Sequence, residues 1–236
     1  MSFFDESKPY HNFGILHWLP IGILFLFFLC IIVWIKKKAP IDQKWNLIYY
    51  LSLVPALAVI LRMILIAYEG KFTLKEDLPL HLCRVLALIL PIAIYYKNKK
   101  WINILYFFIM VGTIQALLTP ELSHGPPHYG YFIYFLLHVF LFCIPIYIIT
   151  ELNIIPSKKD LINAFSYGNI YLIITLCVNF LLESNYFYTR HKPKSASLLD
   201  ILGPWPWYII TVEILTLILF IIAWLPFKNR NKNQEK

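Results

Sequence analysis

The sequence predicts an all-α, polytopic membrane helix bundle, and three observations lead to that fold class. Of the 236 residues, 59% are hydrophobic and only 14% are charged, and the mean hydropathy is +0.65. A soluble domain of this size carries far more charge. Apolar runs of about 20 residues recur along the chain, and short basic clusters separate them. We therefore interpret residues 1–236 as a single integral membrane domain.

Seven apolar runs are long enough to cross a bilayer. The N-terminal stretch lacks the basic region and cleavage site of a signal peptide, so we expect the first run to stay as a permanent span. Prolines inside the runs are compatible with spans, because a bundle accommodates them as kinks. The expected spans cover residues 15–35, 47–68, 79–96, 101–119, 131–150, 161–183 and 205–227.

The charges between the runs predict the orientation of the bundle. Basic residues cluster after the first, third and fifth spans and in the tail, whereas the loop PELSHGPPHYG after the fourth span has none. The positive-inside rule then places the N-terminus outside and the C-terminus in the cytoplasm. This distribution accounts for the basic excess, so we expect no nucleic-acid partner. The clusters contain Lys36, Lys37, Lys38, Lys44, Lys97, Lys99, Lys100, Lys158, Lys159, Lys228, Arg230, Lys232 and Lys236.

This topology gathers most of the unusual polar residues at the outer end, beginning with the stretch DLPLHLCRVLALILP. Its third span opens with His81, Cys83 and Arg84. Ionisable groups are costly inside a bilayer and commonly mark a functional site. Helical residues three apart share a face, so we expect His81 and Arg84 to orient or bind a ligand together. Cys83 then points away from both.

Cys83 needs a base from another helix if it is a nucleophile. His138 fits that need, because it lies about seven residues into the fifth span on the same side of the membrane. The alternative is that Cys83 is an inert buried thiol and His138 makes a hydrogen bond between helices. We interpret Cys30, Cys143 and Cys177 as small apolar residues.

Further polar residues supply candidate binding or supporting groups. Glu121, His124 and His128 lie in a proline-rich turn that fits a rigid lid or a headgroup contact, and the prolines exclude a helical metal-binding pair. No nucleotide-binding, zinc or serine-hydrolase motif is present, so we expect no cofactor and no metal. The other candidates are Asn179 and Glu183 on one helix face, Trp205 and Trp207 as substrate contacts or an interfacial aromatic belt, and Gln115 and Arg62 as network or cavity-lining residues.

The motifs LPLHLC (78–83), QALLTPEL (115–122), SNYFY (184–188) and SLLDILGPWPWY (197–208) occur in this order. With them, residues 45–227 resemble the YwaF-type family of bacterial integral membrane proteins, whose animal relative is transmembrane protein 164. The resemblance implies a bacterial cytoplasmic membrane and cysteine-dependent acyl transfer on glycerophospholipids. It also implies an architecture similar to the androgen-induced-type membrane hydrolases. Carried over residue by residue, it assigns the nucleophile to Cys83 and the histidine to His138. An arginine directly after the cysteine departs from the family pattern and leaves the role of Arg84 open.

The expected function is therefore a lipid acyltransferase or transacylase, with a hydrolase variant if water is the acceptor. Its partner is a membrane phospholipid or lysolipid, and backbone N–H groups near Pro79 or the Asn179 amide would stabilise the oxyanion. A seven-helix transporter, sensor or lipid-binding protein without chemistry is the main alternative, and a structural or assembly factor is a third. The oligomeric state has no signal in the sequence.

Overall fold

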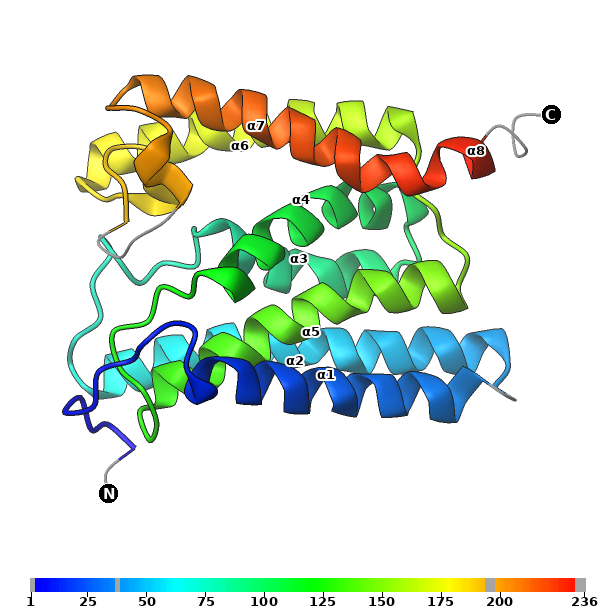
Figure 1. Cartoon of the computed structure of the whole chain (residues 1–236), viewed down its shortest axis with the longest axis horizontal. Helices are drawn as coiled ribbons and strands as arrows, with labels where there is room; N and C mark the ends of the chain where they lie inside the picture. The colour runs from blue at the N-terminus through cyan, green and yellow to red at the C-terminus, as the bar shows by residue number, and fades with distance from the viewer. Residues whose placement is uncertain (1–2, 37–38, 194–197, 232–236) are drawn as a thin grey trace.

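The chain folds as a bundle of helices (Figure 1). The computed structural model describes residues 3–36, 39–193 and 198–231, and these ranges contain no strand. The all-α membrane fold class is thus confirmed. Lys37, Lys38, Lys232 and Lys236 of the orientation prediction lie outside the described residues. The main helices are α1 (Ile15–Lys36), α2 (Ile41–Tyr68), α3 (Leu82–Tyr95), α4 (Lys99–Leu118), α5 (Tyr129–Glu151), α6 (Lys158–Leu182) and α7 (Trp207–Trp224).

Six of these seven helices are long and apolar enough to cross a membrane, and α3 is the exception. Its 14 residues extend over roughly 21 Å, whereas a hydrocarbon core is about 30 Å thick. The expected span began at residue 79, but the chain there forms a tight turn in which Leu80 N donates to Leu78 O at 2.8 Å. The helix therefore starts later than expected. Shorter helical segments are η1 (Tyr186–Tyr188), η2 (Leu198–Ile201), η3 (Leu225–Phe227) and α8 (Lys228–Asn231).

Helix ends differ from the expected spans where polar residues extend a helix. The start of α2 includes Asp42 and Lys44, which pair with Lys97 at 3.2 Å and with Glu151 at 2.9 Å. These ion pairs stabilise the polar first turns of α2, which begins at Ile41, before the apolar run. A capping box of Ser157 and Asp160 likewise starts α6 ahead of its apolar run.

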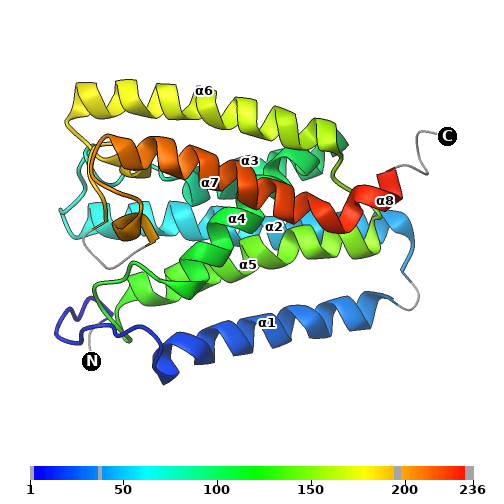
Figure 2. The ribbon, with the colours of Figure 1, turned by 45° about the horizontal axis from the view of Figure 1, so that its top comes forward.

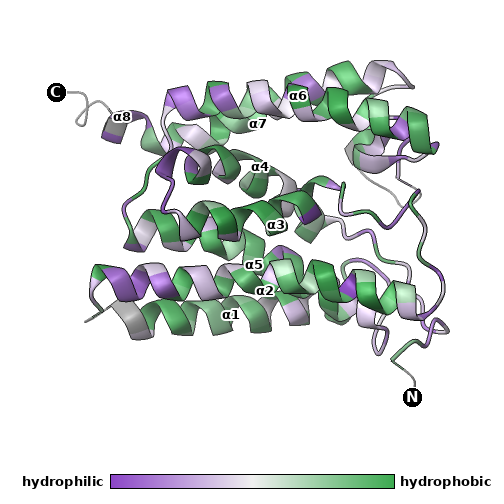
Figure 3. Ribbon diagram, turned by 180° about the vertical axis from the view of Figure 1, so that it is seen from behind, coloured by the Kyte–Doolittle hydropathy of each residue, from purple (hydrophilic) through white to green (hydrophobic). Residues whose placement is uncertain are grey.

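The helices form three groups. In Figure 1, α3 and α4 lie between α6 and α7 on one side and α1, α2 and α5 on the other, and α4 contacts α5, α6 and α7 (the tilted view is in Figure 2). Helix α5 is central, and Leu141, Ile144 and Tyr147 on it are fully buried. By contrast, α1 exposes Ile23 and Leu26, and Figure 3 shows α1 hydrophobic along most of its length. An apolar surface of this kind suits contact with lipid tails.

The two ends of the bundle differ in the length of their loops. We call the end with residues 3–14, 69–81, 119–128 and 183–206 the long-loop end, although residues 194–197 within it are not described. The opposite, short-loop end contains the described basic clusters at Lys44, Lys97, Lys99, Lys100, Lys158 and Lys159. The first and the last described residues, 3 and 231, lie at opposite ends (Figure 1), as the predicted topology requires. Which end faces the cytoplasm stays a prediction.

Residues 3–14 form an N-terminal strap over the loop between α4 and α5, which sequence patterns did not predict. Gly125 N donates to Lys8 O at 2.8 Å, and Tyr10 N donates to Ser123 O at 3.3 Å. Lys71, after α2, forms an ion pair with Glu6 of the strap at 2.7 Å. The strap therefore connects the loops that follow α2 and α4.

Candidate functional site

Cys83 is the second residue of α3, and its sulfur lies beside α4. A Cβ built on Gly112 of α4 would lie 3.8 Å from Cys83 Sγ, so the missing side chain leaves room at the sulfur. Cys83 is partly exposed, whereas Cys143 is buried in the core and Cys30 and Cys177 lie on the exposed surface. Of the four thiols, Cys83 alone combines partial exposure with a place in the first turn of a helix.

The first turn of α3 has free backbone donors. The carbonyl of His81, the residue before the helix, accepts from Arg84 N at 2.9 Å and from Val85 N at 3.2 Å. The N–H groups of Leu82 and Cys83 donate to no oxygen among the described residues. A helix N-terminus with free N–H groups favours negative charge, so it stabilises a thiolate or an oxyanion beside it.

His138 holds its imidazole in one tautomer. Its Nδ1 lies 2.8 Å from the carbonyl oxygen of Tyr134, one turn earlier on α5, and the two rings are 4.2 Å apart. A carbonyl only accepts, so Nδ1 carries the proton. The Nε2 atom then presents a lone pair, and it has no hydrogen-bond partner in the described part of the chain. His138 is therefore a buried imidazole prepared to accept a proton.

The packing of α4 against α5 brings His138 to the depth of Gly112. Tyr134 OH on α5 donates to Ala116 O on α4 at 2.8 Å. The two helices run antiparallel, so one turn onward from Tyr134 is His138 and one turn back from Ala116 is Gly112. Because Gly112 adjoins Cys83, the three residues share one level of the bundle. No hydrogen bond joins Cys83 to His138 within the described residues.

A tyrosine of α6 contacts the turn that leads into α3. The hydroxyl of Tyr171 donates to Leu80 O in that turn. Sequence reasoning missed Gly112, Tyr134 and Tyr171. The spacing of four between Tyr134 and His138 was the available signal, as was the lone glycine in the fourth span.

His81 and Arg84 contact different loops. His81 precedes α3, so the helical spacing on which the shared face was predicted does not apply to it. Its ring lies 5.4 Å from the ring of Tyr186 and 5.5 Å from that of Tyr188. Arg84 instead reaches the loop before α3, where Nη1 donates to Glu76 O at 3.4 Å.

Asn179 organises the loop after α6 and is completely buried. Its Nδ2 donates to Tyr186 O at 2.8 Å and to Thr189 Oγ1 at 2.7 Å. Its Oδ1 accepts from Ser184 Oγ at 2.7 Å and from Tyr186 N at 2.8 Å. Both amide hydrogens are therefore occupied, and the amide has no donor left for an oxyanion.

The loop between α4 and α5 is held by local contacts and by contacts to the strap and to the loop after α6. Gln115 Nε2 donates to Thr119 Oγ1 at 2.8 Å, and Glu121 accepts from Tyr188 OH. His128 caps α5, because its Nδ1 accepts from the N–H of Gly130 at 3.1 Å. Burial and the neighbouring His124 hold the pKa of His128 below its ordinary value, which keeps that nitrogen neutral. His124 Nδ1 lies 3.0 Å from Glu6 O of the strap.

The remaining predicted residues lie at the surface. Trp205 and Trp207 are both exposed, and Trp205 Nε1 donates to Thr189 O at 3.2 Å. This exposure favours the aromatic belt over a direct substrate contact. Glu183 ends α6 and pairs with Lys75 at 2.8 Å, and this pairing lowers the pKa of the Glu183 carboxyl. The Glu183 carboxylate is exposed, whereas the amide of Asn179 is buried.

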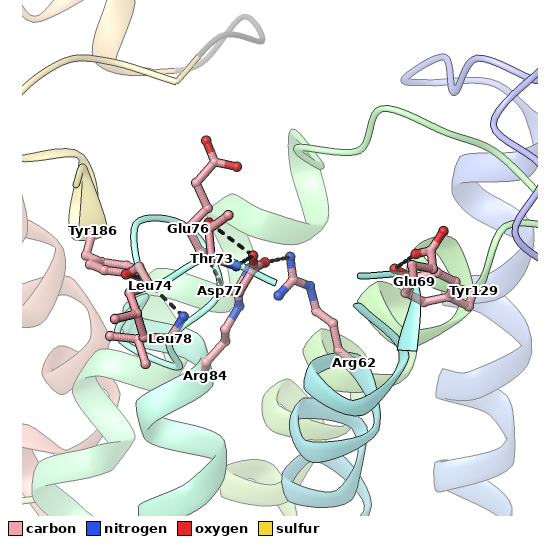
Figure 4. A network of polar contacts seen from close by, with 10 residues as sticks. All are labelled: Arg62, Glu69, Thr73, Leu74, Glu76, Asp77, Leu78, Arg84, Tyr129 and Tyr186. Carbon is pink, nitrogen blue, oxygen red and sulfur yellow. Dashed lines mark hydrogen bonds and ion pairs between the residues drawn. The ribbon is translucent and has the colours of Figure 1, made fainter. Parts of the chain in front are cut away.

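Arg62 belongs to a polar network that Figure 4 displays. Its Nη2 lies 3.3 Å from Asp77 Oδ1, and Asp77 Oδ2 accepts from Thr73 N at 2.9 Å. Beside it, Tyr186 OH donates to Leu74 O at 2.6 Å and accepts from the N–H of Leu78. These contacts fix the loop that leads into α3. The network role expected of Arg62 thus has a definite partner, Asp77, which sequence reasoning did not single out.

Comparison with known proteins gives one match. A sequence model of the TMEM164 family matches residues 12–224, a range that includes Cys83, Gly112 and His138. No curated protein and no solved structure matches the chain.

Proposed function

The chain belongs to the TMEM164 family and is a membrane protein, and from that premise we propose that it is a lipid acyltransferase or transacylase. Cys83 is the nucleophile and His138 is the base. The observation that carries the proposal is the tautomer of His138, whose free Nε2 lies at the level of Cys83 and Gly112. The substrates are membrane phospholipids and lysolipids, and the expected location is a bacterial cytoplasmic membrane.

The first half-reaction transfers an acyl group to Cys83. His138 Nε2 takes the thiol proton, and the sulfur attacks the carbonyl carbon of a lipid ester. The negative oxygen of the tetrahedral intermediate accepts hydrogen bonds from the N–H groups of Leu82 and Cys83. As the carbon–oxygen bond to the glycerol breaks, His138 returns its proton to the leaving alkoxide. A lysolipid departs, and the acyl group remains on Cys83 as a thioester.

The second half-reaction reverses these roles. The hydroxyl of an acceptor lysolipid attacks the thioester while His138 Nε2 takes its proton. The carbon–sulfur bond then breaks, and the thiolate recovers the proton from His138. Since no hydrogen bond joins the two side chains in the described residues, they must approach when substrate binds. Catalytic hydrogen bonds are commonly loose without substrate and tighten in the complex.

The test is lipid turnover by the purified protein in vesicles, with exchange of a labelled acyl chain between phospholipid and lysolipid as the readout. We expect Cys83→Ala to abolish exchange. After rapid denaturation, the labelled acyl group should be found bound to the native protein as a thioester, and it should be absent from Cys83→Ala. Cys177→Ala is the matched control, because it removes an exposed thiol from α6 and should leave exchange unchanged. Full exchange by Cys83→Ala would overturn the proposal. Lipid binding without exchange in the native protein would favour a non-enzymatic lipid-binding protein.

A further inference from the structure

Two arginines from different helices point toward one carboxylate near the start of α3 (Figure 4). Arg62 comes from α2 and lies two turns before its end, and Arg84 lies in the first turn of α3. Arg62 pairs with Asp77, and Arg84 reaches the carbonyl oxygen of the neighbouring Glu76. Placing an arginine inside a membrane costs free energy, and such arginines commonly pair with an acidic group or a ligand.

The charges in this cluster do not balance. Arg62 and Arg84 contribute two positive charges, and Asp77 contributes one negative charge. No carboxylate forms an ion pair with Arg84 within the described residues. The Glu76 side chain points away from both arginines (Figure 4). The other nearby acids have partners of their own: Glu69 bonds Lys71 and Tyr129, and Glu183 bonds Lys75.

The cluster also contains a donor without a partner. Arg62 Nη1 is buried and makes no hydrogen bond among the described residues. Asp77 cannot supply a second oxygen easily, because its Oδ2 already accepts from Thr73 N and Thr73 Oγ1. A buried guanidinium nitrogen left without an acceptor is unfavourable. An excess positive charge and a free donor together suit an anion with several oxygens.

We infer that Arg62 and Arg84 bind the phosphate group of the glycerophospholipid whose acyl ester reaches Cys83. Guanidinium groups bind phosphate through paired N–H donors, and two of them neutralise it better than one. The inference rests on the proposed function, because it places the phosphate next to the reacting ester. Arg84 and Cys83 are consecutive, so they diverge around α3. Arg84 faces the loop before α3 and Cys83 faces Gly112, which suits a phosphate and an ester separated by a few bonds of glycerol.

The test measures binding in the Cys83→Ala protein, so that turnover does not interfere. The probes are a fluorescent glycerophospholipid, the diacylglycerol with the same acyl chains, and inorganic phosphate as a competitor. We expect the phospholipid to bind at least about tenfold more tightly than the diacylglycerol. Arg84→Gln should remove most of this preference and leave diacylglycerol binding unchanged. Lys75→Gln, which removes an exposed charge from the same end, is the matched control.

Arg62→Gln alone leaves Asp77 unpaired and can unfold the loop, so the second variant is the charge-matched pair Arg62→Gln with Asp77→Asn. Loss of the phospholipid preference in both variants supports the inference. An equal preference in native, Arg84→Gln and double-variant proteins overturns it. Displacement of the lipid by inorganic phosphate supports a shared phosphate site. Binding of inorganic phosphate with no lipid preference overturns the lipid assignment.

These outcomes are separate from those of the proposed function. If the native protein prefers the phospholipid because of the arginines but shows no acyl exchange, the phosphate site is supported and the proposed acyl transfer is overturned. If exchange requires Cys83 but the protein shows no preference for the phospholipid, acyl transfer is supported and the phosphate site is overturned.

Discussion

Two polar regions at the long-loop end differ in how completely their hydrogen-bonding groups are paired. Around Asn179, four contacts of 2.7 to 2.8 Å use every donor and acceptor of the amide. Around the start of α3, the N–H groups of Leu82 and Cys83 and the Nη1 of Arg62 have no oxygen acceptor in the described part of the chain. The first region is complete without a ligand, and the second is not.

Under the proposed function, the difference separates residues that hold the fold from residues that bind the substrate. A satisfied buried network stabilises one conformation, whereas an unsatisfied donor costs stability until a ligand supplies the acceptor. Two histidines repeat the contrast. His17 accepts from Phe13 N at 2.9 Å and donates to Leu117 O at 2.8 Å, so both its ring nitrogens are used. His138 uses one.

The largest expected effect comes from exchanging each histidine for glutamine. His138→Gln should lower acyl exchange by about 10²- to 10⁴-fold, because it removes the base, and should change the thermal midpoint little. His17→Gln should lower the free energy of unfolding by about 1–3 kcal/mol while exchange per folded molecule is kept. Exchange assays and thermal unfolding of both variants check this. Equal losses of exchange in the two variants would erase the contrast.

Asn179→Ala should cause the largest loss of stability. It leaves the buried Tyr186 N–H, Tyr186 carbonyl and Ser184 hydroxyl without partners, and we expect a loss of about 3–5 kcal/mol. Denaturant titration in mild detergent measures it, and Cys83→Ala is the comparison with an expected change below about 1 kcal/mol. A stable Asn179→Ala protein that has lost exchange would instead assign Asn179 to the reaction.

Gly112→Ala should raise stability and lower activity. A Cβ at residue 112 would lie in ordinary contact with Cys83 Sγ, so the helix accepts it and gains roughly 0.5–1 kcal/mol. The added methyl fills the space in which the ester must approach, so we expect several-fold slower exchange and slower labelling of Cys83 by a maleimide. Gly22→Ala in α1, where nothing lies within 4 Å, should gain similar stability with unchanged exchange. Unchanged labelling in Gly112→Ala would refute the steric role.

The smallest effect concerns the N-terminal strap and pH. The hydrogen bond and charge of Lys71 hold the pKa of the Glu6 carboxyl below its ordinary value of about 4.5. A depressed carboxyl pKa stabilises the fold above that value, and the contribution disappears as pH falls through the folded pKa. We expect exchange of the Gly125 amide, which donates to Lys8 O, to accelerate in acid beyond the intrinsic pH effect. Lys71→Met should abolish this extra acceleration, whereas Lys75→Met should keep it.

Sequence patterns predicted most of the fold because bilayer thickness imposes strong constraints on length and hydrophobicity. The expected spans overlap the seven helices, and the residues at the long-loop end were identified from charge asymmetry. The start of α3 escaped prediction because apolar residues continue through the turn at Leu78 and Leu80. Hydropathy alone cannot distinguish an apolar turn from a helix.

For the candidate site, the sequence predicted the reactive residue types but not the residues that surround them. Cys83 and His138 stand out because thiols and imidazoles at membrane depth are few, but their partners depend on helix register. The closeness of Gly112 to Cys83 depends on how α3 packs against α4, and the level of His138 depends on the register that the Tyr134–Ala116 hydrogen bond sets. Asn179 stood out for the same reason as His138, and only the count of its hydrogen bonds assigns it to the loop. Asp77 belonged to a loop whose path was unknown.

The short length of α3 links this protein to the thickness of the membrane around it. Its neighbours are long enough to reach both leaflet surfaces, while the first turn of α3 lies deeper than their ends (Figure 1). Lipid esters lie between the headgroups and the hydrocarbon, so a recessed thiol is suited to meet them without extracting the lipid from its leaflet. Host membranes built from longer or shorter acyl chains would then raise or lower the esters relative to the sulfur. Under the proposed function, the acyl-chain length of the membrane would therefore control how closely lipid esters approach the Cys83 sulfur.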